Sequence, residues 1–417
     1  MRGRALRVMA LGTILLCLLL NPVYAQEKVK VTLWSIGDEN GTYAAVFNKL
    51  IPKIEEQLPH IDIEVEYNSN EEKFTVALAG GVAPDIIILA TRSAGKFVEA
   101  GLLAPIDREV FGVETDEELR GLFYGGAIGS MWMSDDVYFM PTEVTTLGTF
   151  VNLDLLAEAG LEPAVPKTWE GLLAYAKRAM RKDAEGNVQI AGLHLNRHYI
   201  WPSLYWVAMV RQAGTDWIVD GQPQFSHPGA VDHIEFYQSL HSVEGVTKPG
   251  ISNADFYRGE AAIYVGGQYE LAHMFNPERV QYSWTTGGFP HFEGKPRVST
   301  SYAWGMYVPT ASKVQREAWQ VIEALTSPEH APVWYETSSF LIPRAGDWII
   351  EALGDDPRRL VFIEELDYAR MEIAHPEEGR IINAILGAEQ RLVNENQPSR
   401  SVLEELDREI LTIISGN

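Results

Sequence analysis

The segment from Lys28 to Ala90 alternates between strand-like and helix-like patterns, and this alternation limits the possible folds more than any other feature. The strand-like stretches alternate apolar and polar residues, whereas the helix-like stretches place their apolar residues on one helical face. Strands that alternate with helices build a parallel sheet covered by helices on both faces. The sequence therefore predicts an α/β fold, with strands over 28–34, 60–68 and 84–90 and helices over 42–58 and 71–79.

The stretch "APDIIILATR", Ala83 to Arg92, combines a core strand with a polar end. Ile86 to Leu89 have no polar face, as a strand covered on both sides requires. Thr91 and Arg92 follow directly, and ligands of open α/β sheets bind outside the carboxyl ends of the strands. The pattern predicts a buried central strand whose end borders a binding site.

Longer helical patterns follow Asn152. Thr168 is a candidate N-cap, with Glu170 in the first turn of the helix that it starts. A length of 417 residues suffices for two or three domains, and no repeat of fixed period is evident. Beyond Asn152 the pattern predicts helices over 153–161, 166–182, 227–242 and 380–415, and strands over 261–267 and 304–310.

The first 25 residues have the layout of a signal peptide. Three arginines precede an apolar run from Val8 to Leu20, and the small residues needed for cleavage end at Ala25. The run is too short to span a bilayer, which takes about 20 apolar residues. We therefore expect a periplasmic or extracellular protein.

The sole cysteine, Cys17, lies inside this segment, so we expect no disulfide or thiol nucleophile in the remaining chain. A leucine precedes Cys17 where an acylated cysteine would need a small residue, so a lipid anchor is only the alternative. The formal charge is −23, and without the three arginines of the segment it is −26. Such an acidic surface repels phosphates, which argues against nucleic acid as a partner.

Several catalytic and nucleotide-binding motifs are missing from the sequence. It contains no phosphate-binding glycine loop, no G-x-G-x-x-G, no G-x-S-x-G and no H-E-x-x-H. His194 and His198 are four residues apart, but no third ligand accompanies them, so we predict neither a metal site nor a cofactor. Carboxylates are too numerous for their presence to identify a glycosidase, which would be recognised by carboxylate separation.

Aromatic residues gather instead in polar, loop-like contexts. Flat apolar rings beside hydroxyl, amide and carboxylate groups suit pyranose rings, which are apolar on their C–H faces and polar at their rims. Each ring alone is as compatible with a core position as with a binding site. The aromatic residues in such contexts are Trp34, Tyr199, Trp201, Tyr269, Tyr302 and Trp304.

Seven segments in order resemble the carbohydrate-binding class of extracellular solute-binding proteins that serve ABC importers, most closely the maltose and maltodextrin type. They are "LWSIGDENG", "NEEKFTVALAGGVAPDIIILATRSAGKFVEAGLLAPID", "MPTEVTTLGTFVNLDLLAEAGL", "VPKTWEGLLAYAKR", "FYRGEAAIYVGGQYE", "YAWGMYVPTASKVQREAWQVIEAL" and "PSRSVLEELDREI". The resemblance implies two α/β lobes, each a mainly parallel sheet flanked by helices, that close on a ligand about a hinge. It implies residues 26–141 plus about 290–327 for the N-terminal lobe, and 142–289 plus about 328–417 for the C-terminal lobe.

The resemblance also implies a set of ligand contacts at strand ends, on the first crossing and among second-lobe aromatics. Tyr269 stands where the family usually has a stacking tryptophan after Gly-Pro, and here Gly267-Gln268 precedes it. The acid–arginine pair that the family often has after the third strand is absent, which argues against maltose itself. The implied contacts are Trp34, Asp38, Glu39, Asn40, Thr91, Arg92, Ser93, Glu143, Thr145, Tyr199, Trp201, Tyr269, Trp304 and Arg344.

The resemblance implies a non-enzymatic, monomeric protein that binds a solute, an oligosaccharide by preference, and delivers it to a membrane permease. Two alternatives remain open. The first is a secreted carbohydrate-active enzyme. The second is a binder of the same fold for a non-sugar: Asp38 and Glu39 would suit a polyamine, whereas a phosphate ligand would need more cations than Arg92, Arg197 and Arg344.

Overall fold

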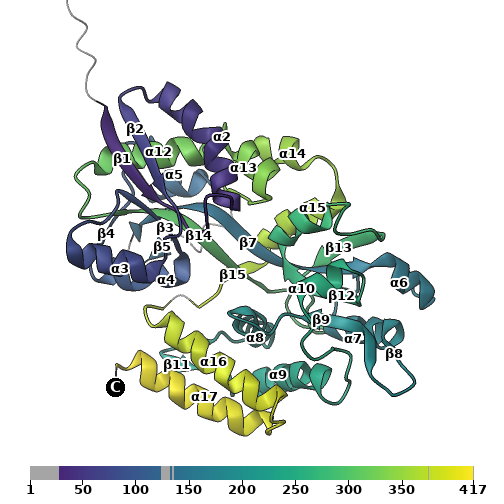
Figure 1. Cartoon of the computed structure of the whole chain (residues 1–417). Helices are drawn as coiled ribbons and strands as arrows, with labels where there is room; N and C mark the ends of the chain where they lie inside the picture. Colours follow the sequence, from purple (N-terminus) through teal and green to yellow (C-terminus); the bar gives the residue numbers. More distant parts are fainter. Residues whose placement is uncertain (1–27, 124–131, 134–135, 374, 417) are drawn as a thin grey trace, which may run out of the picture.

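The computed structural model describes residues 28–123, 132–133, 136–373 and 375–416, so the predicted signal peptide over residues 1–25 lies outside the described residues. The chain forms two lobes, each with helices packed around its part of one mixed sheet (Figure 1). The predicted two-lobe α/β fold is therefore confirmed. In the described ranges, no helix is both long and apolar enough to cross a membrane.

The first lobe follows the predicted alternation closely. Asn70 accepts a hydrogen bond from the backbone N–H of Lys73 and starts helix α3, and Gly81, at φ 68°, ends it in the left-handed conformation. The elements of this lobe are β1 (Val29–Trp34), α2 (Thr42–Gln57), β2 (Ile61–Glu66), α3 (Glu71–Gly80), β3 (Ile86–Ala90), α4 (Thr91–Glu99), β4 (Leu103–Ala104), α5 (Asp116–Gly121), β5 (Trp132–Met133), β6 (Asp136–Val137), α12 (Gln315–Thr326), α13 (Ala331–Ser338) and α14 (Trp348–Leu353).

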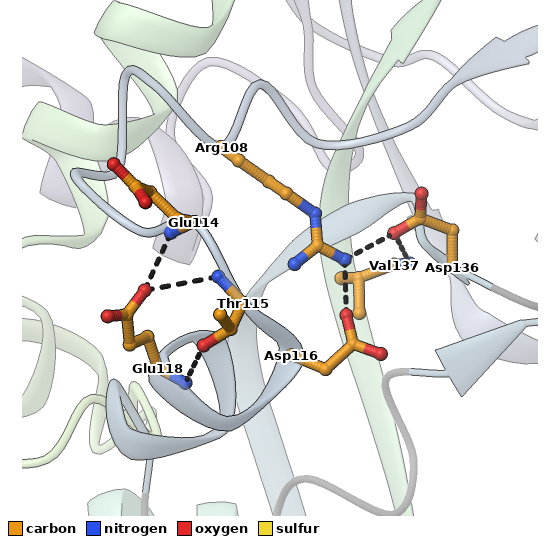
Figure 2. Close-up of polar contacts among 7 residues, drawn as sticks. All are labelled: Arg108, Glu114, Thr115, Asp116, Glu118, Asp136 and Val137. Carbon is orange, nitrogen blue, oxygen red and sulfur yellow. Dashed lines mark hydrogen bonds and ion pairs between the residues drawn. The ribbon is translucent and has the colours of Figure 1, made fainter.

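Polar contacts fix the position of α5 in this lobe (Figure 2). Thr115 and Glu118 form a capping box, in which each side chain accepts a hydrogen bond from the backbone of the other. Arg108 donates to Asp116 of α5 at 2.6 Å and to Asp136 of β6 at 3.1 Å. The start of α5 is thereby attached to the strand pair that precedes the first crossing.

The second lobe contains the longer helices. Thr168 caps α7 by accepting from the N–H of Gly171, as predicted. The elements are α6 (Leu153–Glu158), α7 (Trp169–Ala179), β8 (Arg181–Lys182), β9 (Val188–Leu195), α8 (Trp201–Gln212), β10 (Ile218–Val219), β11 (Gln222–Pro223), α9 (Pro228–His241), α10 (Asn253–Tyr257), β12 (Ala261–Gly267), η2 (Gln268–Glu270), α11 (Leu271–Met274), β13 (Trp284–Gly288), α15 (Pro357–Glu364), η3 (Glu365–Asp367), α16 (Glu378–Val393) and α17 (Ser399–Ile414).

The predicted helical stretch over 380–415 is two helices rather than one. Helix α16 ends at Val393 and α17 begins at Ser399, directly after Pro398. Asn396 between them adopts the left-handed conformation at φ 54°. The two helices pack side by side at the outer edge of the second lobe (Figure 1).

Three segments connect the lobes: β7 (Phe139–Asn152), β14 (Ser299–Pro309), and the stretch from the end of α14 to the start of α16, which contains β15 (Ala369–Met371). The main path of the sheet runs β2-β1-β3-β14-β7-β12-β9-β8. Strands β1, β2 and β3 are parallel, as are β12 and β9, whereas β14 pairs antiparallel with both β3 and β7. The sheet is mixed at its centre because the crossing strands run back between the lobes.

The packing of the two main cores favours lobe boundaries later in the chain than the expected 290 and 328. Residues up to Val144 and from Ala303 to Leu353 pack in the first core, whereas Tyr302 and Ile373 pack in the second. Helix α13 belongs to the first core because its Trp334 packs against Tyr43 of α2, with ring centroids 5.8 Å apart. The division into lobes stays a prediction, and this packing favours assigning α12, α13 and α14 to the first lobe.

Candidate functional site

Strands β7 and β14 place four polar or aromatic side chains at the boundary between the lobes. In their antiparallel register Thr145 lies opposite Tyr302, and Glu143 lies opposite Trp304. Glu143, Thr145 and Tyr302 are buried, while the half-buried ring of Trp304 packs against both main cores. One pair of strands therefore brings together three of the predicted contacts: Glu143, Thr145 and Trp304.

Arg92 of α4 joins this cluster to the second lobe. Its Nη2 donates a hydrogen bond to the hydroxyl of Tyr199 at 2.7 Å, and its guanidinium carbon lies 5.2 Å from the ring centroids of both Tyr199 and Trp304. Tyr199 belongs to the loop between β9 and α8, so this contact crosses from one lobe to the other. A guanidinium between two rings gains cation–π attraction from each of them.

The second lobe contributes two more predicted aromatic residues. Trp201 starts α8, and Tyr269 lies in η2, with their ring centroids 6.4 Å apart. A β-carbon at Gly267 would lie 2.6 Å from Cε1 of Tyr269 and 2.9 Å from Cγ2 of Thr145. Glycine at position 267 therefore allows the Tyr269 ring to lie against the first crossing.

A cavity of about 430 Å³ opens between the lobes at Arg92. Helices α3 and α4 of the first lobe line it, together with the Tyr199 loop and α16 of the second. Its volume falls in the range of small-molecule sites. The lining residues are Glu71, Arg92, Ser93, Lys96, Tyr199, Ile200, Pro376, Glu377, Gly379, Arg380, Ile382, Asn383 and Leu386.

The polar loop after β1 lies at the same edge of the sheet as Arg92. Asp38, Glu39 and Asn40 are exposed, and the N–H of Asn40 donates to Oδ1 of Asp38 at 2.8 Å. Because β1 and β3 are parallel, their carboxyl ends and the loops that follow lie on one side. These three residues form an open rim rather than part of the buried cluster.

Of the predicted contacts, Arg92, Ser93 and Tyr199 line this cavity. Three of the others have structural partners instead. The hydroxyl of Thr91 donates to the carbonyl of Ala303 at 3.0 Å and ties α4 to β14. The half-buried ring of Trp34 lies under Nζ of Lys73, 4.5 Å from the ring centroid. Arg344 is buried in the first lobe, with its guanidinium carbon 5.9 Å from the ring of Phe111, so we leave it out of the proposed site.

The contribution of α16 to the cavity lining was not predicted from the sequence. Ile382, Asn383 and Leu386 lie on the face of this helix that borders the cavity. A helical pattern was visible there, but its spacing indicates only that one face is buried. Lys96 was also missed, although it lies one helical turn after Arg92 on α4, which is the spacing of neighbours on a helix surface.

The two histidines four residues apart do not face a common point. His194 is buried, and its Nε2 lies 3.0 Å from Oδ1 of Asn253, whereas His198 is exposed in the loop before α8. Among the residues that the structure describes, no group of three or more His, Cys, Asp or Glu side chains is arranged to hold a metal ion.

Glu143 is the most perturbed acid at the β7–β14 crossing. Burial raises the pKa of Glu143 to about 8, although the nearby Arg92 guanidinium opposes part of that rise. The carboxyl is therefore mainly protonated at neutral pH and can donate as well as accept a hydrogen bond. A neutral acid beside Arg92 suits a ligand hydroxyl, which also donates and accepts.

We expect Glu143→Gln to remove part of the pH dependence of stability. The pKa of Glu143 in the folded protein lies above its ordinary value of 4.5, so burying this side chain becomes less favourable as pH rises from about 4.5 to about 8. Across that range the free energy of unfolding of the variant should rise relative to wild type by roughly 1 kcal/mol per pH unit. Urea unfolding at several pH values measures the difference. The exposed Glu404→Gln is the control, and a Glu143→Gln difference independent of pH would contradict the expectation.

Comparisons with known proteins agree with the two-lobe architecture. The maltotriose-binding protein of Pyrococcus abyssi (strain GE5 / Orsay) is 26% identical over 252 residues, which cover 59% of this chain and 51% of that protein. The sugar-binding protein MalE of Xanthomonas citri superposes with a TM-score of 0.78 at 21% identity, covering 93% of this chain and 98% of that one. UgpB of Mycobacterium tuberculosis, solved with glycerophosphocholine, has a TM-score of 0.78 at 17% identity and covers 93% and 99%.

Residues 38–332 match the family of bacterial extracellular solute-binding proteins. The match spans the β1 loop, the first two crossings, and the strands and helices that carry Arg92, Thr145, Tyr199 and Tyr269. By this match over most of its length, the chain belongs to the family of bacterial extracellular solute-binding proteins.

Proposed function

We propose that this protein captures an oligosaccharide between its two lobes and delivers it, chemically unchanged, to the membrane permease of an ABC importer. The observation that carries the proposal is the cavity at Arg92, because its lining comes from both lobes. A ligand there contacts both lobes only when they are closed, so binding shifts the population toward the closed form. A permease that recognises the closed form then responds only to loaded protein.

The chemistry around the cavity supports a sugar. The ring of Tyr199 and the polar side chains of Ser93 and Asn383 line the cavity. The rings of Trp201, Tyr269 and Trp304 belong to the neighbouring cluster at β7 and β14. An aromatic ring beside hydroxyl and amide groups matches the apolar and hydroxyl surfaces of a pyranose ring, and the charged side chains of the lining can also bond sugar hydroxyls. The relatives that bind maltotriose and other sugars support the same class of ligand.

A specific observation keeps a non-sugar ligand as the second candidate. UgpB shares the fold and binds glycerophosphocholine, so the two-lobe architecture alone does not select a sugar. In this chain the rim residues Asp38 and Glu39 are exposed and acidic, which favours a cationic group such as an amine. A polyamine or a choline-bearing ligand is the alternative within the same mode of action.

A thermal-shift screen tests both candidates. A ligand that binds only the folded protein stabilises it by about 2.7 kcal/mol at 100 times its Kd, enough to raise the melting temperature by several degrees. We expect maltotriose or mannotriose to produce such a shift, and spermidine and glycerophosphocholine to produce none. A shift with spermidine or glycerophosphocholine and none with any oligosaccharide would overturn the sugar assignment.

Two further measurements test the remaining parts of the proposal. Incubation with oligosaccharides followed by chromatography should return them unchanged, and release of shorter products would instead support a secreted carbohydrate-active enzyme. Mass spectrometry of the exported protein should show a chain that begins after Ala25, as the signal-peptide pattern predicts. A lipid-modified Cys17 would support the anchored alternative.

A further inference from the structure

Two acidic side chains are buried without hydrogen bonds beside the third crossing. Glu372 directly follows β15 and is 3% exposed, and within the described structure neither of its carboxylate oxygens has a hydrogen-bond partner. Glu378 is the first residue of α16 and is 2% exposed, and its Oε1 likewise has none. The Glu372–Glu378 pair therefore lies in an environment that stabilises ionised carboxylates poorly.

Arg92 is the nearest cation, and its pairing with Glu372 is incomplete. The Nη1 atom of Arg92 lies 3.9 Å from Oε1 of Glu372, beyond hydrogen-bond distance, and makes no other hydrogen bond among the described residues. Nη2 of the same guanidinium is engaged by the hydroxyl of Tyr199. Arg92 thus lies between a partner in the second lobe and a carboxyl on the third crossing.

Other titratable groups surround the pair on every packed element. Arg211 of α8 faces Glu372 while donating to the carbonyl of Met371 at 2.7 Å. Glu71 of α3 faces Glu378 and is itself paired with Lys96 of α4. The remaining neighbours are Glu143 of β7, Tyr302 and Tyr307 of β14, Tyr199, and His375, whose ring packs against Trp217.

Two buried carboxyls with one incompletely paired guanidinium are not both ionised. An unpaired buried charge costs several kcal/mol, and such a group takes up a proton instead. Arg211 offsets little of this cost, because its hydrogen bonds go to Asp216 and to the backbone. The pair therefore holds at least one proton in the observed arrangement.

The arrangement exists only while the lobes are together. Arg92 lies on α4 of the first lobe, while Tyr199 and Glu378 belong to the second, and a β-carbon at Gly95 of α4 would lie only 3.6 Å from Cα of Pro376. The cavity of about 430 Å³ already borders this group, so moving α4 away from α16 admits water to it. Opening therefore solvates the carboxyls, whereas closing buries them.

Tyr199 provides a second sign that this contact depends on the relative position of the lobes. It is 65% exposed, yet its backbone adopts the left-handed conformation at φ 59°, which is costly for a non-glycine residue. Such a conformation persists where surrounding contacts hold it, and within the described ranges the side chain of Tyr199 is held only by Arg92, whose Nη2 donates to its hydroxyl. The Tyr199 loop is thus held toward α4.

We propose that closure of the lobes is coupled to uptake of a proton by the Glu372–Glu378 pair. The proposal rests on the proposed function only in that the lobes open and close about the cavity. It makes closure easier in acid and harder in base.

The expected direction with pH follows from the burial of Glu372. Burial raises the pKa of Glu372 to about 7 in the observed arrangement, with Arg92 and Arg211 opposing part of the rise, and burial also raises the pKa of Glu378 well above its ordinary value. When the lobes open and water reaches Glu372, its pKa returns toward 4.5. The proton-linked preference for closure is therefore complete below about pH 4.5 and is lost as pH rises through about 7.

Fluorescence energy transfer between the lobes tests the proposal without a ligand. Val76 on α3 and Val243 after α9 are 72% and 82% exposed and lie in different lobes, so Val76→Cys and Val243→Cys provide labelling positions once Cys17 is replaced by serine. We expect the closed-to-open ratio to fall about ten-fold or more between pH 5.5 and 8.5. Glu372→Gln, a permanently neutral isostere, should reduce that fall, and the double variant Glu372→Gln/Glu378→Gln should hold the ratio nearly constant.

A matched variant separates this effect from a general loss of buried charge. Glu389→Gln alters an equally buried acid on α16, the helix that Glu378 starts, but the carboxylate of Glu389 accepts from Arg197 and Tyr237 within the second lobe. It should keep the wild-type dependence on pH. Tyr199→Phe removes the hydroxyl that Arg92 bonds, and it should lower the closed fraction at every pH while keeping the slope.

The outcomes divide clearly. A wild-type ratio that changes less than two-fold over this range, or a Glu372→Gln dependence equal to that of wild type, overturns the inference. The wild-type titration decides the first point even if Glu372→Gln does not fold. If pH leaves the lobes unchanged while maltotriose closes them, only the inference fails. If pH moves the lobes but no oligosaccharide does, the sugar assignment fails and the inference stands.

Discussion

Replacing Tyr269 by alanine is expected to weaken oligosaccharide binding by about ten- to one-hundred-fold, because stacked rings of this kind contribute roughly 1–3 kcal/mol. The ring lies against Thr145 of the first crossing and faces Trp201, so it occupies the point where second-lobe aromatics meet β7. Titration calorimetry with the oligosaccharide that gives the largest thermal shift measures the change in Kd.

Two variants identify the source of that loss. Tyr269→Phe keeps the ring and removes the hydroxyl, so it should retain most of the affinity if stacking dominates. Tyr368→Ala is the control, since Tyr368 is also partly exposed but packs over Arg297, whose guanidinium carbon is 3.9 Å from its ring. Unchanged affinity in Tyr269→Ala would remove Tyr269 from the proposed site.

Local patterns predicted the elements that carry the site better than the contacts between them. Strand β3, from Ile86 to Ala90, is fully buried as its unbroken apolar run indicated, and α4 begins at Thr91, directly after it. The periodicity of a single segment is enough to reveal such a strand, because burial on both faces excludes polar residues. Placing Arg92 at a strand end required no knowledge of the rest of the chain.

The pairing of residues between crossing strands could not be predicted from the periodicity of single segments. Glu143 and Trp304 are opposite each other in a register that depends on how β7 and β14 run between the lobes. Glu372 lies 280 residues after Arg92 and becomes its neighbour only through the third crossing. The local sequence therefore could not predict that Glu372 is buried or that it lacks hydrogen bonds. Buried charge clusters of this kind are determined by the tertiary fold.

Arg344 is the converse case, a predicted contact that has core partners in the structure. It follows a proline in a loop-like stretch, which is a plausible place for a ligand contact. In the structure it packs near the rings of Phe111 and Phe123 and pairs loosely with Glu323, with 3.9 Å between Nη2 and Oε1. An arginine in a loop can equally pack against a hydrophobic core, because its aliphatic stem and planar guanidinium cover aromatic surface.

The break between α16 and α17 was present in the sequence but outweighed by the helical spacing on either side. Pro398 lacks the N–H that a continuous helix needs, and the preceding residues favour turns. The break has a functional consequence, because it lets α17 return along α16 and support the face that borders the cavity. At this point the proline, and not the periodicity, determines where one helix ends and the next begins.

Replacing Gly192 by alanine is expected to destabilise the second lobe by about 3 kcal/mol, the upper end of the usual cost of overpacking. A β-carbon on Gly192 of β9 would lie 2.1 Å from the carbonyl oxygen of Ala176 and 2.6 Å from its carbonyl carbon. Both are backbone atoms of α7, so relief requires the helix to move away from the sheet. Urea denaturation followed by far-ultraviolet circular dichroism measures the loss.

Gly387→Ala is the matched control, since a β-carbon at this position of α16 meets no atom within 4 Å. There the substitution should be neutral or stabilising by about 0.5–1 kcal/mol, because alanine is the better helix former. Strand β9 pairs with β12, whose end leads to Tyr269. Gly192→Ala should therefore also weaken sugar binding, but less than Tyr269→Ala does. Equal stability of the two glycine variants would mean that α7 is free to shift from β9, and the rigid support of Tyr269 inferred from this packing would then be wrong.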